Sequence, residues 1–214
     1  MKAVLFDLDG TLADTIEDIG GAMNAALADA GLPAHPLDDY RRFIGDGIEA
    51  LTERALPPGR AALRDPTMAA FRLHYAGRLV ERTRPYDGIV AVLDALAARH
   101  IPAAVLSNKP EPATVTIVER LFGPGRFVAV AGALPGRPRK PDPWRALDIA
   151  RAAGVAPGDW LFVGDTAVDM QTAGAAGMTA IGAGWGYRGA GELAASGATA
   201  LLARPADLIP LLPR

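Results

Sequence analysis

An apolar run that ends in two acids, residues 3–11 (AVLFDLDGT), constrains the fold of this chain more than any other stretch. A continuous apolar run before Asp7 is typical of a strand that is buried on both faces, as in a parallel sheet. Because side chains alternate along a strand, Asp7 and Asp9 should point the same way while Leu8 faces the opposite side. In open α/β sheets ligands bind beyond the carboxyl ends of the strands, which is where this pair of carboxylates falls.

Two simpler interpretations compete with a binding site here. Asp and Gly after a strand can form a solvated turn, and residues 7–10 alone do not exclude it. A calcium-binding EF-hand loop does not fit, because Leu12 would replace the turn glycine and Asp18 the bidentate glutamate. A site is therefore indicated only if chemically matched residues follow the later strands.

Composition limits the class of protein. The chain has 214 residues, of which 50% are hydrophobic and 21% charged, enough for one sizeable core and a smaller insert. The 22 basic and 24 acidic residues give a formal charge of -2, so we expect neither nucleic acid nor a membrane surface as partner. The absence of Cys excludes disulfides and thiolate catalysis. With no signal-peptide pattern and no apolar run of about 20 residues, a cytoplasmic location is expected; monomer and homodimer both stay open.

Periodicity divides the chain into two parts. Residues 15–84, here called the helical insert, show helical spacing and no strand pattern, with capping-box spacing at Thr15 and Asp18. Helices are expected in the insert at 48–56 and 61–82. From residue 85 strand and helix patterns alternate, which predicts a mainly parallel sheet with helices on both faces. The expected strands are 101–106, 127–131, 160–163 and 178–181. The predicted fold is thus α/β, with a core domain of residues 1–14 and 85–214 and a cap domain of residues 15–84.

Three polar clusters follow the later strands of this predicted sheet. They are Ser107 with Asn108, Lys140-Pro141-Asp142-Pro143, and Asp165 with Asp169 one helical turn on. Each has a plain structural explanation, since Ser, Asn and Thr-x-x-Asp often cap helices and a lysine is usually solvated. Their shared position at strand ends is what favours a common site.

These clusters, in this order, resemble the four motifs of the haloacid dehalogenase superfamily. The residues that carry the resemblance are Asp7-Leu-Asp9-Gly-Thr11, Ser107, Lys140-Pro-Asp-Pro and Gly164-Asp165-Thr-Ala-Val-Asp169. Ser107-Asn108-Lys109-Pro110 and Gly184-Trp185-Gly186-Tyr187 are similar to the phosphoglycolate phosphatase-like group. The resemblance implies a Rossmann-like parallel-sheet core with an inserted all-helical cap.

The resemblance also implies a magnesium-dependent phosphatase that acts through an aspartyl-phosphate. Asp7 would be the nucleophile, Asp9 the general acid and base, and Lys140 the cation that offsets charge repulsion. Thr11 would orient Asp9. Ser107 and the Asn108 backbone would bind the transferring phosphoryl group. The implied Mg²⁺ ligands are Asp7, the Asp9 main-chain carbonyl and Asp165, with Asp169 in direct or indirect contact.

The helical insert would determine the substrate, expected to be a small organic phosphate monoester such as 2-phosphoglycolate. The turn at residues 43–47 resembles the specificity loop of the family's cap, although a plain inter-helix turn stays open. Arg42, Gly45, Asp46 and Gly47 are the candidate substrate contacts, with Arg41 and Arg188 as further partners for a carboxylate. Asp46, pointing inward, would instead favour a sugar phosphate, because a carboxylate accepts hydrogen bonds from hydroxyls. Asp14 is a candidate support for the hinge into the insert.

Three other functions are alternatives to a phosphatase. A dehalogenase needs no acid at position 9, so Asp9 argues against it. A phosphomutase would share every core motif, and a catalytically silent binding protein would be favoured by loss of a motif carboxylate, of which none is lost.

Overall fold

The computed structural model describes residues 2–213, and its centre is a six-stranded parallel sheet. The strand order is β5-β4-β1-β6-β7-β8, with β1 in the middle, paired to β4 through Val4 and Ala103 and to β6 through Val4 and Leu161. The strands are β1 (Ala3–Phe6), β4 (Ala103–Pro110), β5 (Ala129–Ala133), β6 (Trp160–Gly164), β7 (Thr179–Ala183) and β8 (Ala200–Leu202). This arrangement confirms the predicted α/β class.

Alternating side chains of the central strands build two separate cores. Val4 and Phe6 of β1 point into one hydrophobic cluster, while Leu5 points into the cluster on the other face. Burial of β1 on both faces explains why its sequence is continuously apolar. The acids that follow β1 are therefore attached to a central strand that is packed on both faces.

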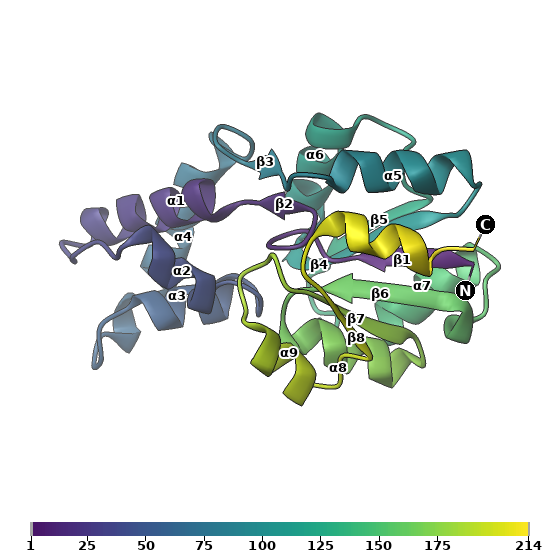
Figure 1. Ribbon diagram of the computed structural model, residues 1–214. Helices are drawn as coiled ribbons and strands as arrows, with labels where there is room; N and C mark the ends of the chain where they lie inside the picture. The colour runs from purple at the N-terminus through teal and green to yellow at the C-terminus, as the bar shows by residue number, and fades with distance from the viewer. Residues whose placement is uncertain (1, 214) are drawn as a thin grey trace.

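Helices cover both faces of this sheet (Figure 1). The first face packs against α5 (Ile89–Ala98), α6 (Glu111–Phe122) and the 3-10 helix Pro205–Leu211. The second face packs against α7 (Trp144–Ala152), α8 (Ala167–Ala176) and α9 (Ala190–Ala195). In the part of the chain that the structure describes, no helix is long and apolar enough to cross a membrane.

The helical insert contains four α-helices that lie beyond the tips of the strands, on the left in Figure 1. They are α1 (Ile16–Asp29), α2 (Tyr40–Phe43), α3 (Ile48–Ala55) and α4 (Arg64–Ala76), with 3-10 turns at Leu37–Asp39 and Ala61–Leu63. Their apolar faces pack on one another around Met23, Leu27 and Tyr40. The insert thus has its own small hydrophobic core.

Two chain crossings join the insert to the sheet. β2 (Ala13–Asp14) pairs antiparallel with β3 (Arg84–Pro85), so the outgoing and returning chains are hydrogen-bonded to each other. Asp14 also accepts a hydrogen bond from the Ile16 backbone N–H at 3.2 Å, at the start of α1. The helices of the insert therefore begin and end at one two-stranded hinge.

The predicted capping box at the start of α1 is wrong. Thr15 is the N-cap residue but its side chain makes no capping hydrogen bond. Asp18 instead accepts hydrogen bonds from the backbone N–H groups of Arg82 and Thr83, at 3.0 and 2.8 Å, and from the Thr83 hydroxyl. The helix expected at 61–82 is the shorter α4, which ends at Ala76 before Gly77, and the N–H groups of Arg82 and Thr83 bond to Asp18 outside it.

Other boundaries differ near the ends of elements. The strand expected at 101–106 continues through Pro110, with an irregular register against β5 after Leu106. The two short strands β2 and β3, and α9 with β8, were not predicted, because their sequences are short and carry little periodicity. The extension of β4 matters for function, since it places Ser107 and Lys109 on the same side of the strand.

Candidate active site

Asp7 lies directly after β1 and is buried, with 4% of its surface exposed. Its Oδ1 accepts hydrogen bonds from the Leu8 backbone N–H at 2.7 Å and from Lys140 Nζ at 2.9 Å. Within residues 2–213 the second oxygen, Oδ2, has no hydrogen-bond partner. One oxygen is thus held in place while the other is available for chemistry.

Lys140 comes from the loop between β5 and α7 and is the cation at the centre of this group. Its ammonium also contacts Asp169 Oδ1 at 2.7 Å and the Leu106 carbonyl at 3.1 Å. Burial disfavours the ammonium, but Asp169 and Asp7 outweigh burial, so the pKa of Lys140 is raised and the side chain is charged. The sequence-predicted lysine therefore lies between two of the predicted acids.

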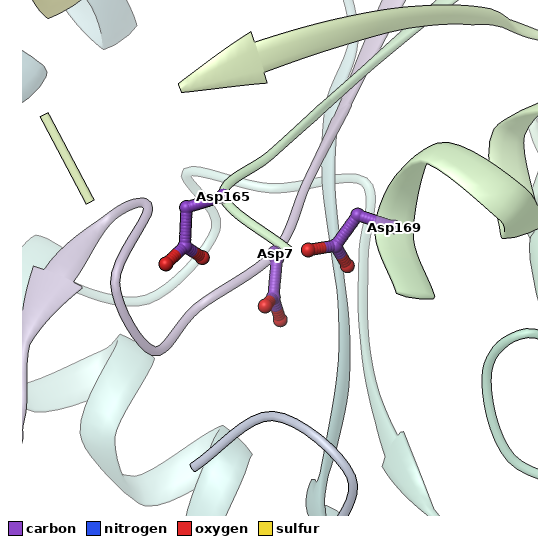
Figure 2. A group of neighbouring side chains, drawn as sticks. All are labelled: Asp7, Asp165 and Asp169. Atoms are coloured by element: carbon purple, nitrogen blue, oxygen red, sulfur yellow. The ribbon is translucent and has the colours of Figure 1, made fainter. Parts of the chain in front are cut away.

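Asp7, Asp165 and Asp169 form a buried acidic cluster. Each offers an oxygen, and these oxygens lie within 4.8 Å of one another. Figure 2 shows the three carboxylates converging from the ends of β1 and β6 and the start of α8. Burial raises the pKa of Asp7 to about 7 against the pull of Lys140. Burial, followed by the charges of Asp169 and Asp7, raises the pKa of Asp165 well above its usual range.

The acidic cluster carries more negative charge than the buried cations beside it balance. With Asp9 included, four buried carboxylates face two buried ammonium groups, Lys109 and Lys140, which leaves two negative charges unbalanced. A hard divalent cation with oxygen ligands supplies that charge and prefers these donors. The donor set therefore fits Mg²⁺. Asp169 is already engaged, since its Oδ1 binds Lys140 and its Oδ2 accepts from the Thr166 backbone and hydroxyl.

Asp165 is held by a close approach of two backbone segments. A Cβ on Gly10, where φ is +85°, would lie 2.2 Å from Asp165 Oδ2, and one on Gly186 would lie 2.3 Å from its Cβ. The Tyr187 N–H donates to Asp165 Oδ2 at 2.7 Å and the Thr11 hydroxyl to Oδ1 at 3.0 Å. Thr11 thus orients Asp165 and not, as expected, Asp9.

Asp9 is held by residues that the sequence did not single out. Lys109 Nζ contacts both its carboxylate oxygens, at 2.7 and 2.8 Å, and the Thr15 hydroxyl donates to Oδ1 at 2.7 Å. Thr15 in turn bonds to Tyr187, whose hydroxyl accepts from the Thr15 backbone N–H at 2.9 Å. Asp9 is therefore fixed both from β4 and from the hinge of the insert.

Ser107 and Asn108 line the cavity above Asp7, as expected from their place after the strand. The Asn108 side chain accepts from the Lys140 backbone N–H at 2.9 Å and donates to the carbonyls of Lys140 and Gly45, each at 3.1 Å. This one amide links the lysine loop, the end of β4 and the helical insert.

The turn at residues 43–47 is brought to the site only in part. Gly45 and Gly47 line the cavity. Asp46 does not point inward, because its carboxylate binds Arg54 at 2.5 Å. Arg42 is exposed and outside the cavity lining. The predicted contacts through Arg42 and Asp46 are therefore not formed in this structure.

The two other candidate arginines are also engaged elsewhere. Arg41 binds Asp38 at 2.8 Å. Arg188 donates to the carbonyls of Arg42 and Ile44, at 3.1 and 3.0 Å, and so holds the turn against the sheet domain.

Three residues were not predicted as parts of the site from the sequence: Lys109, Thr15 and Arg72. Arg72 lines the cavity from α4. For Lys109 a signal existed: if the strand is continued past Leu106, Ser107 and Lys109 fall on one face by the two-residue period. The role of Thr15 was hidden by its capping spacing, and Arg72 by the many other arginines of the insert.

Comparison with known proteins places this geometry in a family. A family model described as haloacid dehalogenase-like hydrolase matches residues 1–177. The chain is 34% identical to a phosphoglycolate phosphatase of Aquifex aeolicus over 212 residues, covering 99% of this chain and 97% of that protein. It is 36% identical to a phosphoglycolate phosphatase of Chromobacterium violaceum, covering 91% and 90%. The chain belongs to the haloacid dehalogenase-like hydrolase family.

Solved structures agree with this assignment. A crystal structure from Lactobacillus delbrueckii subsp. bulgaricus superposes with a TM-score of 0.91 at 28% identity, covering 99% of this chain and 98% of that one. A haloacid dehalogenase-like family protein of Streptococcus pneumoniae has the same fold, with a TM-score of 0.87 at 20% identity. The resemblance to the phosphoglycolate phosphatase-like group, first based on short motifs, thus extends over almost the whole chain.

Proposed function

We propose that this protein is a magnesium-dependent phosphatase that hydrolyses a small organic phosphate monoester through an aspartyl-phosphate at Asp7. The observation that carries the proposal is the asymmetric environment of the Asp7 carboxylate. Its Oδ1 is held by Leu8 and Lys140, its Oδ2 has no hydrogen bond from the described residues, and the carboxylate belongs to the acidic cluster. The relatives named phosphoglycolate phosphatase support the same reaction class.

In the first step Asp7 Oδ2 attacks the phosphorus atom of the ester. A bond forms between this oxygen and phosphorus while the bond from phosphorus to the ester oxygen breaks. The leaving alkoxide takes a proton from the Asp9 carboxyl group, which lines the same cavity as Asp7. Splitting hydrolysis in this way replaces one difficult displacement by two easier ones.

In the second step Asp9, now a carboxylate, accepts a proton from water. The water oxygen attacks phosphorus, and the bond between phosphorus and Asp7 breaks, which releases inorganic phosphate and restores the Asp7 carboxylate and the protonated Asp9 carboxyl group. Thr15 and Lys109 hold Asp9 at a fixed position through both steps. Lys140 lowers the repulsion between the Asp7 carboxylate and the anionic phosphoryl group.

Mg²⁺ would be held by Asp7, Asp165 and the Asp9 main-chain carbonyl, while Asp169, whose two oxygens accept hydrogen bonds from Lys140 and Thr166, would hold Lys140 beside the metal site. When bound it neutralises the charge that develops on the phosphoryl oxygens. Ser107 and the Asn108 backbone would bind the same oxygens from the β4 side, which their place in the cavity lining supports.

The preferred substrate in this proposal is 2-phosphoglycolate, the substrate named for the relatives. Gly45 and Gly47 line the cavity, so their backbone N–H groups are candidate partners for the carboxylate of phosphoglycolate, while Arg42 and Asp46 lie outside.

The test is hydrolysis of a panel of phosphate esters, including phosphoglycolate and sugar phosphates, with Mg²⁺ and with excess chelator. We expect Mg²⁺-dependent release of phosphate that Asp7→Asn abolishes, with Asp46→Asn as an equally conservative control outside the cavity. Full turnover in chelator, or transfer of phosphate between substrate positions without release, would contradict the proposal. If a sugar phosphate is preferred tenfold or more, the proposed phosphatase activity stands but phosphoglycolate is not the preferred substrate.

A further inference from the structure

A cavity of about 410 Å³ extends from Asp7 and Asp9 into the space under the helical insert. Ligand pockets of this size, roughly 300 to 1,000 Å³, enclose molecules with several times the volume of phosphoglycolate. The reacting carboxylates occupy only its floor. The rest of the cavity lining would contact the leaving group of the ester, so its side chains indicate the shape and charge of that group.

One wall of this cavity is aromatic and apolar. Phe71 and Tyr75, one turn apart on α4, lie stacked with ring centroids 5.2 Å apart and an angle of 15° between their planes. Ile44, Ile48 and Leu51 continue the apolar lining from the other side of the insert. Phe71 and Tyr75 are largely buried in the core of the insert, and a flat apolar group would cover the part of their rings that lines the cavity, which phosphoglycolate would leave open to water.

Arg72 brings a positive charge to the same wall. It follows Phe71 on α4 and lines the cavity with its side chain exposed. Within the described chain Arg72 makes no hydrogen bond and no ion pair, and Glu49, the acid its charge influences, is already bound by Arg139 at 2.6 Å. The neighbouring Arg54 and Arg188 are both hydrogen-bonded to protein groups. Arg72 is therefore available to an anion in the cavity.

We propose that this cavity binds phosphate monoesters whose leaving group joins a flat apolar body to a carboxylate, and that Arg72 is the specificity-determining residue for that carboxylate. The inference rests on the proposed phosphatase reaction at Asp7. The phosphate lies over Asp7, the apolar body covers Phe71 and Tyr75, and the carboxylate reaches the guanidinium of Arg72, whose paired N–H groups match it. Phosphoglycolate, the substrate preferred in the proposed function, shares the phosphate and the carboxylate of this class and lacks only the contact with the apolar wall.

Two matched pairs of esters separate these contributions. Phenyl phosphate and 4-carboxyphenyl phosphate differ only in the carboxylate, and ethyl phosphate lacks the aromatic body. For the wild-type protein we expect KM to fall about twofold to fivefold from phenyl to 4-carboxyphenyl phosphate, the size expected of an exposed ion pair. KM for phenyl phosphate should in turn be lower than that for ethyl phosphate.

Variants assign the two effects to residues. Arg72→Met should remove the advantage of 4-carboxyphenyl phosphate and leave phenyl phosphate unchanged, and Arg72→Lys should restore part of it. Arg42→Met, an exposed arginine of the insert outside the cavity, is the matched control and should change neither KM. Phe71→Leu keeps an apolar side chain but removes the flat ring, so it should raise KM for both aryl esters and not for ethyl phosphate.

The same comparison by calorimetry on Asp7→Asn gives dissociation constants without turnover, so failure of the inference and failure of the proposed reaction are distinguishable. The role of Arg72 is overturned if phosphoglycolate is hydrolysed through Asp7 but 4-carboxyphenyl phosphate binds no better than phenyl phosphate. It is also overturned if Arg42→Met removes the preference for 4-carboxyphenyl phosphate as fully as Arg72→Met does. If ethyl and phenyl phosphate bind equally, the apolar wall makes no contact with the leaving group, and the proposed substrate class is overturned. If no ester is hydrolysed, the calorimetric differences still decide the inference.

Discussion

Lys109 Nζ contacts both carboxylate oxygens of Asp9, at 2.7 and 2.8 Å, and both side chains are buried. The same ammonium lies 5.1 Å from the centre of the Tyr75 ring on α4. Burial disfavours the charge of Lys109, but Asp9 and Tyr75 outweigh burial and raise its pKa. The residue proposed to transfer protons is therefore fixed by a permanent cation that also touches the helical insert.

Replacing Lys109 should impair proton transfer more than phosphate binding. For Lys109→Met we expect kcat/KM to fall about 10²-fold with ethyl phosphate, within the range of general acid catalysis. With 4-nitrophenyl phosphate, whose leaving group departs without a proton, the fall should be about threefold or less. Steady-state kinetics with both esters measure this, and Asp9→Asn should show the same pattern. Equal losses with the two esters, in a protein that melts as the wild type does, would show that Lys109 has a purely structural role.

Thr11 and Thr15 provide a matched pair of hydroxyls with different partners. Thr15 donates to Asp9 and Thr11 to Asp165. Thr15→Val should therefore lower kcat for alkyl esters with little change in the Mg²⁺ concentration needed for half-maximal rate. Thr11→Val should raise that Mg²⁺ concentration, by roughly 10-fold or more as for other residues that orient metal ligands. Magnesium titrations of both variants test this. If Thr11→Val lowered kcat and Thr15→Val raised the Mg²⁺ concentration, Thr11 would orient Asp9, as first expected.

Much of this site could be predicted from the sequence because its parts follow strand ends. The alternation that puts Asp7 and Asp9 on one side, and the parallel order that gathers Lys140 and Asp165 at one edge, are local rules. The partners of Asp9 are not local. Thr15 has the spacing of a helix cap, and only the approach of Tyr187 from the other end of the chain makes it a partner of the acid.

The insert was harder to predict for a related reason. Its helices follow from periodicity, but the direction in which each arginine points depends on packing between the insert and the sheet domain. Arg42 precedes the predicted loop and still lies outside the cavity, whereas Arg72, in the middle of a helix, lines it. Asp18 shows the same limit, because its partners are Arg82 and Thr83, more than sixty residues away.

The buried acids should make the stabilising effect of Mg²⁺ depend on pH. Burial raises the pKa of Asp7 from 3.8 to about 7, so the folded metal-free protein binds more protons than the unfolded chain between these values. Its stability is therefore highest below pH 4 for this group and falls as the pH rises to about 7. Under the proposed function Mg²⁺ binds the ionised acids, so adding it should reverse that loss.

Thermal unfolding measures this directly. At a hundredfold excess over Kd, ligand linkage contributes about 2.7 kcal/mol, or roughly 5 to 10 °C in Tm for a chain of this size. We expect such a shift at pH 8 and a clearly smaller one at pH 5, where protons compete with the metal. Asp7→Asn should lose most of the shift at pH 8. Equal shifts at the two pH values would contradict the metal site at this cluster.

Asp46 should contribute little to substrate binding, contrary to the sequence-based expectation. Its carboxylate pairs with Arg54, and a largely exposed pair of this kind contributes about 0 to 1 kcal/mol. Asp46→Asn should change KM for phosphoglycolate and for sugar phosphates by less than about threefold. Kinetics with both substrates check this, and a large change with sugar phosphates alone would show that Asp46 turns inward when substrate binds.

The central claim is the covalent intermediate at Asp7, and trapping it is the most direct test. Asp9→Asn with 4-nitrophenyl phosphate should permit the first step and slow the second, because the ester needs no acid but the intermediate needs a base. Rapid mixing should then give a burst of about one nitrophenol per active site. Acid quenching and peptide mapping should find phosphate on Asp7 that hydroxylamine removes. No burst and no bound phosphate, or phosphate on another residue such as Ser107, would contradict the mechanism.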